Sequence, residues 1–160
     1  MKNGSTWFLR GVIGVLAVIV GALCYVVLPE INIGWGVDLP HVAYLKYPVI
    51  LGLSATAVAF YIALWQTFKL LNYVDKRQVF SAQSVKSLRS IKYCAFIISA
   101  LYIGGLWPVY HVAQVEDAPG LILIGAFFAL IAAGVGVFAG LLEKSLKNAI
   151  KIKSENELTV

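Results

Sequence analysis

Charged residues are scarce in this sequence: 13 Lys and Arg and 8 Asp and Glu make up 13% of its 160 residues. A soluble domain carries about 25% charged residues. Hydrophobic residues make up 60% of the chain, and the mean hydropathy is +0.83. This composition excludes a disordered chain, which is poor in hydrophobic residues and rich in net charge. It also argues against an ordinary soluble enzyme, because too few polar side chains are present to cover a water-facing surface.

Cysteines and catalytic motifs are also rare. The two cysteines, Cys24 and Cys94, form no CxxC pair and no cluster with histidine, so neither a zinc site nor a disulfide framework is indicated. We interpret both as buried free thiols within helices. No HExxH, P-loop or recognisable Ser/His/Asp arrangement is present. We therefore predict a protein that is not an enzyme and that has no cofactor and no metal.

What the sequence does contain is four long runs without a charged residue, each of 18 to 25 residues. A helix of about 20 apolar residues crosses the hydrocarbon core of a bilayer, and none of the runs alternates as a barrel strand does. We predict an all-α protein, a single domain over residues 1–160 that forms a four-helix transmembrane bundle. The predicted parts are spans at residues 11–28, 47–68, 93–115 and 120–142, a cytoplasmic loop at 69–92 and a cytoplasmic tail at 143–160.

Basic residues are distributed unevenly between these spans. Two precede the first span, six lie in residues 69–92 and four in the tail, whereas residues 29–46 contain only Lys46. Lys and Arg gather on the cytoplasmic side of membrane proteins. We therefore predict that both termini are cytoplasmic. The net charge of +5 then reflects topology and does not indicate direct binding of nucleic acid. The first run is longer than the core of a signal peptide, about 7–15 residues, so we expect it to remain as a helix.

The connections between the spans predict two kinds of structure. Glu116 to Gly120 is short enough to force an antiparallel hairpin, with Asp117 capping the fourth helix and Pro119 in its first turn. Residues 81–92 instead place Val85, Leu88 and Ile91 on one helical face, with basic residues mostly off that face. This pattern predicts an amphipathic helix that runs into the third span.

Small and polar residues within the spans indicate how the helices pack. Gly136 and Gly140 form a GxxxG pattern, and small residues of this kind let helices approach closely in lipid. We expect packing within the bundle, with a homo-oligomer seam as the alternative. Ser54, Thr56, Gln66, Thr67 and Ser99 are expected to form interhelical hydrogen bonds. A water-filled path through Ser54, Gln66 and Ser99 would instead indicate transport.

Two histidines lie toward the outer side. His111 is about five residues from the outer boundary of the third span, and His41 lies in the first outer loop. An outer carboxylate could come from Asp38, Glu116 or Asp117. Imidazole titrates near neutral pH, at a pKa of about 6.5, so a proton switch or a scattered metal site is one interpretation. An interfacial histidine without a function is the interpretation we prefer.

The basic loop is the most informative polar feature. Residues 69–92 contain six Lys and Arg but one Asp. Each basic residue near anionic lipid contributes about 1 kcal/mol of attraction, so lipid anchoring is one interpretation. The other is a docking platform for an acidic face of a cytoplasmic protein, joined by the tail. The candidate docking residues are Lys76, Arg77, Lys86, Arg89 and Lys92.

Several segments of the chain, in order, resemble a known family. They are Ala43-Tyr44-Leu45-Lys46-Tyr47-Pro48, residues 70–76, residues 80–94, Asp117-Ala118-Pro119-Gly120 and residues 152–160. Together these segments resemble the bacterial membrane proteins catalogued as domain of unknown function 2975. The resemblance covers residues 43–160 and the first span in character only. It departs at residues 107–111, so it implies no role for His111.

The resemblance implies a four-helix protein of the bacterial cytoplasmic membrane with no assigned activity. Family members are often encoded beside a small helix-turn-helix regulator, which implies a regulatory pairing. We therefore expect a non-enzymatic sensor or sequestration protein that holds such a regulator on its cytoplasmic loop and tail. The alternative is a small transport, channel or immunity-type membrane protein, which needs a polar path between its helices.

Overall fold

The computed structural model consists of four long α-helices and one short 3-10 helix. It describes residues 2–37 and 40–159, with side chains for residues 4–34 and 40–159. The helices are α1 (Lys2–Val37), η1 (Pro40–Leu45), α2 (Lys46–Asp75), α3 (Ala82–Val115) and α4 (Gly120–Leu158). Each of the four α-helices is long and apolar enough to cross a membrane. The prediction of an all-α, four-helix transmembrane fold is therefore confirmed.

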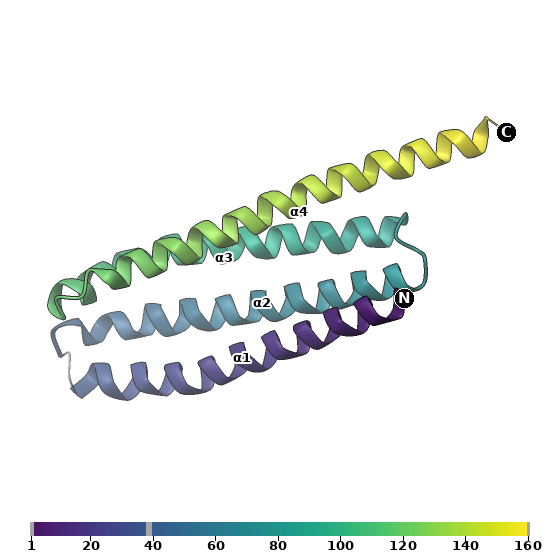
Figure 1. Ribbon diagram of the computed structural model, residues 1–160. Coiled ribbons are helices and arrows are strands. Elements are labelled where there is room, and N and C mark those ends of the chain that lie inside the picture. Colours follow the sequence, from purple (N-terminus) through teal and green to yellow (C-terminus); the bar gives the residue numbers. More distant parts are fainter. Residues whose placement is uncertain (1, 38–39, 160) are drawn as a thin grey trace.

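The four helices lie side by side in the order of the chain, each antiparallel to the next (Figure 1). α4 packs along α3, α3 along α2, and α2 along α1. Within the described residues, no Cα atom of α4 lies within 8 Å of α1 or α2. The bundle is therefore an open row of helices and does not close around one central core. Most large apolar side chains face outward, such as Tyr25 at 83% exposure, as expected where the surrounding solvent is hydrocarbon.

The helices extend beyond the predicted spans at both ends of the bundle. α1 does not end with the predicted span at residue 28 but continues to Val37, with Pro29 inside the helix. Proline removes one backbone hydrogen bond and bends a helix without always ending it. Residues 82–92 and the third span form one uninterrupted helix, as predicted. α4 continues past residue 142 as far as Leu158, which at 1.5 Å per residue adds about 24 Å.

Two of the helix ends carry a residue in the left-handed conformation. Arg77 follows α2 with φ of 58°, and Asp117 follows α3 with φ of 52°. The amide of Gln78 donates to the carbonyl of Tyr73, and the amide of Ala118 to that of Ala113. These six-to-one bonds close a Schellman motif at each end. Asp117 thus ends α3 and does not cap α4, whose N-cap is Pro119 without a side-chain hydrogen bond.

η1 closes the end of the bundle that holds the α1–α2 and α3–α4 connections. Its Val42 and Leu45 are buried against Val112 of α3. At the other end, the Ser81 hydroxyl accepts a hydrogen bond from the Ser84 amide and caps α3. Only the short segment between Asp75 and Ala82 lies outside the helices in the predicted loop 69–92.

Candidate functional site

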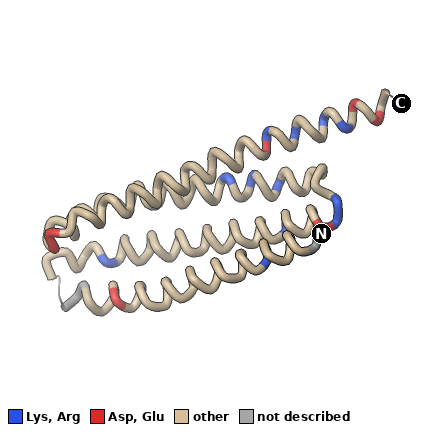
Figure 2. The backbone as a smooth tube through the Cα atoms, viewed as in Figure 1, with Lys and Arg blue, Asp and Glu red and all other residues tan. Residues whose placement is uncertain are grey.

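Charged residues gather at one end of the bundle, which we call the basic end (Figure 2). It comprises residues 4–10, 69–92 and 143–159. The opposite end holds Glu30, Lys46, Glu116 and Asp117. Between the two ends the helices carry no Lys, Arg, Asp or Glu over the described spans. The polar chemistry of this protein is therefore concentrated at the basic end.

The centre of the basic end is Glu143, the first residue after the fourth span. Its side chain is buried between α3 and α4, at 4% exposure. Oε1 accepts from Arg89 Nε at 2.9 Å and lies 3.1 Å from Lys147 Nζ, while Oε2 accepts from Lys92 Nζ at 2.8 Å. We call these four residues the Glu143 cluster. One carboxylate holds three cations and joins α3 to α4.

These cations keep Glu143 ionised. The hydrogen bond from Lys92 lowers its pKa most, those from Arg89 and Lys147 lower it further, and burial opposes them, leaving a pKa of about 2. A buried carboxyl group without such partners would instead have a raised pKa. Glu143 therefore carries its negative charge throughout the physiological pH range.

The sequence builds this cluster through helical spacing. Arg89 and Lys92 are three residues apart and lie on one face of α3, while Glu143 and Lys147 are four apart on α4. Gly140 makes room for the aliphatic stem of Lys92: a Cβ atom there would lie 3.2 Å from Lys92 Cδ. A close approach of the two helices thus places the ammonium group on the carboxylate.

Both glycines of the GxxxG pattern, Gly136 and Gly140, face α3. A Cβ atom at Gly136 would lie 2.9 Å from Cε1 of Phe96, one turn along α3 from Lys92. The two glycines therefore receive two α3 side chains that are also four residues apart. In this arrangement α3 occupies the face that a homo-oligomer seam would need.

The five predicted docking residues divide into two groups. Arg89 and Lys92 direct their charged groups to Glu143, with side-chain exposures of 44% and 24%. Lys76, Arg77 and Lys86 are exposed and form no ion pair with any described residue. The structure therefore does not bring the five together as one set of free cations. Sequence analysis missed Glu143 because its two partners on α3, Arg89 and Lys92, lie more than 50 positions away.

A second ion pair ties α1 to α2 at the basic end. Arg10 Nη2 donates to Asn72 Oδ1 at 2.7 Å and to Asp75 Oδ2 at 2.8 Å. The guanidinium also lies 5.7 Å from the centroid of the Phe68 ring, within the range of a cation–π contact. The sequence indicated Arg10 only as a topology signal, whereas the structure gives it a role in holding the first helix.

Beyond the Glu143 cluster, α4 projects away from the other helices (Figure 1). All residues from Lys151 to Thr159 are exposed. A groove of about 550 Å³ lies between this tail and Phe80, and Ile152 and Lys153 line it. Lys153 Nζ is 5.8 Å from the centroid of the Phe80 ring. Apolar and basic groups are thus displayed together outside the spans.

Three of the polar side chains within the spans donate hydrogen bonds to backbone carbonyls. Ser99 Oγ donates to the carbonyl of Ala129 at 2.9 Å, which confirms the predicted interhelical hydrogen bond for this residue. Thr56 and Thr67 donate to carbonyls of their own helix, so the prediction of interhelical hydrogen bonds is wrong for them. It is also wrong for Ser54 and Gln66, whose side chains form no hydrogen bond within the described part of the chain.

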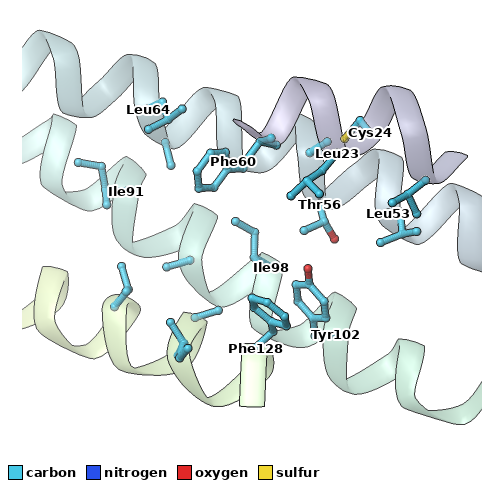
Figure 3. A pocket seen from close by; sticks show the side chains of 18 of the residues that line it. Leu23, Cys24, Leu53, Thr56, Phe60, Leu64, Ile91, Ile98, Tyr102 and Phe128 are labelled. Atoms are coloured by element: carbon cyan, nitrogen blue, oxygen red, sulfur yellow. The ribbon is translucent and has the colours of Figure 1, made fainter. Parts of the chain in front are cut away.

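All four helices line a cavity of about 730 Å³ within the spans (Figure 3). Its lining is apolar except for Cys24, Thr56, Thr67 and Tyr102. Ser54, Gln66 and Ser99 do not line it. The polar path that the transport alternative needs is therefore not formed by these three residues in the structure.

The two histidines do not belong to a metal site among the described residues. His41 is exposed on η1, and His111 packs its ring edge-on against Trp107, with centroids 5.0 Å apart. No three His, Cys, Asp or Glu side chains converge on one point in the described chain. Asp38, the carboxylate suggested beside His41, lies outside the described residues.

Four apolar helices with charge concentrated at one end define an integral membrane protein of four spans. The chain belongs to DUF2975, a family of proteins of unknown function whose profile matches residues 36–160. The resemblance seen in its motifs is thereby confirmed. The chain is 44% identical over 161 residues to the uncharacterized membrane protein YoaS of Bacillus subtilis (strain 168), and the match covers all of both chains. No solved structure matches it.

Proposed function

We propose that this protein is a non-enzymatic receptor of the bacterial inner membrane that holds a regulator at its basic end. In this proposal the basic end and both termini face the cytoplasm, because Lys and Arg are enriched there. The observation that carries the proposal is the division of cations at this end. Some stabilise the bundle, as in the Glu143 cluster, whereas Lys76, Arg77 and Lys86 are exposed and unpaired among the described residues.

The partner is a soluble protein with an acidic face. Exposed cations that form no internal ion pair are available to a partner, and they steer an oppositely charged surface toward them. The projecting tail of α4 adds Lys144 and Lys151, which are exposed and likewise unpaired within the described residues. The family resemblance implies that the partner is a helix-turn-helix regulator. The membrane protein then binds the regulator and makes no contact with DNA itself.

Of the five candidate docking residues, Arg89 and Lys92 are the weaker ones. Their charges are already directed at Glu143, so a partner would have to compete with a buried carboxylate for them. Arg89 is still 44% exposed and can offer its remaining N–H groups. The stronger candidates for docking are Lys76, Arg77 and Lys86.

Affinity purification tests the proposal. The tagged full-length protein is extracted in mild detergent, and proteins bound to it are identified by mass spectrometry. We expect a stoichiometric soluble DNA-binding protein that is lost from the triple variant Lys76→Glu, Arg77→Glu, Lys86→Glu. Lys46→Glu reverses a charge at the opposite end of the bundle and should retain it.

Two results would contradict the proposal. A partner that stays bound to the triple variant would place docking elsewhere. Recovery of the protein alone would favour the transport or immunity alternative, which flux assays in liposomes then examine. A fluorescent protein fused to the C-terminus checks the topology separately, because such a fusion matures only in the cytoplasm.

A further inference from the structure

The cavity within the spans has the size of a ligand site. Its volume of about 730 Å³ lies within the range of about 300–1,000 Å³ that is usual for small-molecule pockets. It is bounded by all four helices, including residues 20–28 of α1 and 128–135 of α4. Within the described residues, α4 approaches α3 but not α1 or α2, which leaves space between α4 and the α1–α2 pair.

Among the described residues that line the cavity, Tyr102 offers a hydroxyl donor without an acceptor. The Tyr102 hydroxyl forms no hydrogen bond with any described residue, although its ring stacks on Phe128 with centroids 5.7 Å apart. Figure 3 shows this hydroxyl and that of Thr56 pointing into the same part of the cavity from facing walls. The Thr56 proton is already donated to Gly52. An unpaired hydroxyl in an apolar environment is unfavourable, so Tyr102 is suited to donate to a bound molecule.

The residues that line the cavity also indicate that a bound molecule is uncharged. Among the described residues, no Lys, Arg, Asp, Glu or His side chain lines the cavity. A charged ligand would have no counter-ion there, in a medium where unpaired charge is costly. The apolar walls instead favour a hydrocarbon body, and the Tyr102 hydroxyl favours an acceptor such as a carbonyl or ether oxygen.

We infer that this cavity binds an uncharged lipophilic molecule whose oxygen acceptor receives the Tyr102 hydroxyl. This inference goes beyond the proposed function, because it assigns a ligand class to the membrane-embedded part of the protein. The position of Tyr102 distinguishes this molecule from bulk phospholipid. Tyr102 lies about 14 Å from Tyr93 and about 20 Å from Val115 along α3. Phospholipid carbonyls lie at the edges of a core about 30 Å thick, out of its reach.

Photolabelling of the full-length protein in lipid nanodiscs tests the inference. The probe is an alkyl benzophenone, which is uncharged, carries one ketone acceptor and inserts into nearby C–H bonds on irradiation. We expect saturable labelling of cavity residues such as Ile98 and Phe128. Tyr102→Phe keeps the ring but removes the donor, and should weaken half-saturation about 5-fold, as expected for a hydrogen bond of about 1 kcal/mol. Tyr110→Phe, an exposed tyrosine of the same helix outside the cavity, should not change it.

A second pair of variants tests the cavity itself. Ala132 lines it, and Ala132→Trp should abolish saturable labelling, whereas Ala126→Trp on an exposed face should not. Unsaturable labelling spread over the lipid-facing surface would overturn the site. Equal half-saturation in Tyr102→Phe would show that plain hydrocarbon fills the cavity and would overturn the ligand class. Cross-links from cavity residues to a second copy would assign the cavity to an oligomer interface instead.

Discussion

Removing the charge of Glu143 should separate α3 from α4 at the basic end. In Glu143→Gln the three cations Arg89, Lys92 and Lys147 lose the anion that they share and repel one another. Breaking a buried ion pair by removing one partner costs about 3–5 kcal/mol. The cost here falls at the lower end, because Arg89 and Lys147 are 44% and 50% exposed and regain water.

The lowered pKa of Glu143 indicates a similar free-energy cost for its removal. Its fall from an ordinary value of 4.5 to about 2 corresponds to about 3 kcal/mol of preferential interaction with the ionised form. We therefore expect Glu143→Gln to lower the free energy of unfolding by about 3 kcal/mol. Unfolding in mixed micelles of dodecyl sulfate and a mild detergent, followed by tryptophan fluorescence, measures this difference.

The matched control is Glu155→Gln, on the same helix as Glu143. Glu155 is exposed, and its carboxylate forms no ion pair with any described residue. It should change the free energy by less than about 0.5 kcal/mol. A double-mutant cycle between Glu143→Gln and Lys92→Gln should show strong non-additivity, since either change removes the same interaction. If Glu143→Gln were as stable as the control, the cluster would not hold the two helices together.

Three further predictions follow from the same contacts. Because the folded pKa of Glu143 is depressed, its contribution is complete above pH 4.5 and is lost as the pH falls toward 2; unfolding titrations should show this loss in wild type and not in Glu143→Gln. Gly136→Ala should destabilise by about 1–3 kcal/mol through overpacking, whereas Gly134→Ala, with open space around its Cβ position, should be neutral or stabilising in thermal melts. Arg77→Gly should stabilise by about 1 kcal/mol by relieving a left-handed backbone, whereas Lys76→Gly, at φ of −80°, should not; equal effects on unfolding would exclude backbone strain as the cause.

The sequence alone determined the class of this protein. Each span is a contiguous uncharged run, and a bilayer core accepts a lone segment of this kind only as a helix with its backbone paired internally. The same local logic predicted that residues 82–92 continue into the third span, as α3 does. Because these properties depend on residues close together in the chain, no tertiary information was needed for them. The family could be identified for the same reason, since its motifs are short and continuous.

Only the tertiary structure decided which side chains of these helices contact one another. The pairing of Glu143 with Arg89 and Lys92 joins positions 54 and 51 residues apart, and it depends on the rotation of α3 against α4. The sequence likewise showed Arg77 and Asp117 as polar turn residues but not as the left-handed ends of α2 and α3. The cavity around Tyr102 lies beside α4, which within the described residues packs on α3 and not on α1 or α2. Hydrophobic periodicity specifies which residues face lipid or protein, but it does not specify which helix each face meets, and that choice created both the Glu143 cluster and the cavity.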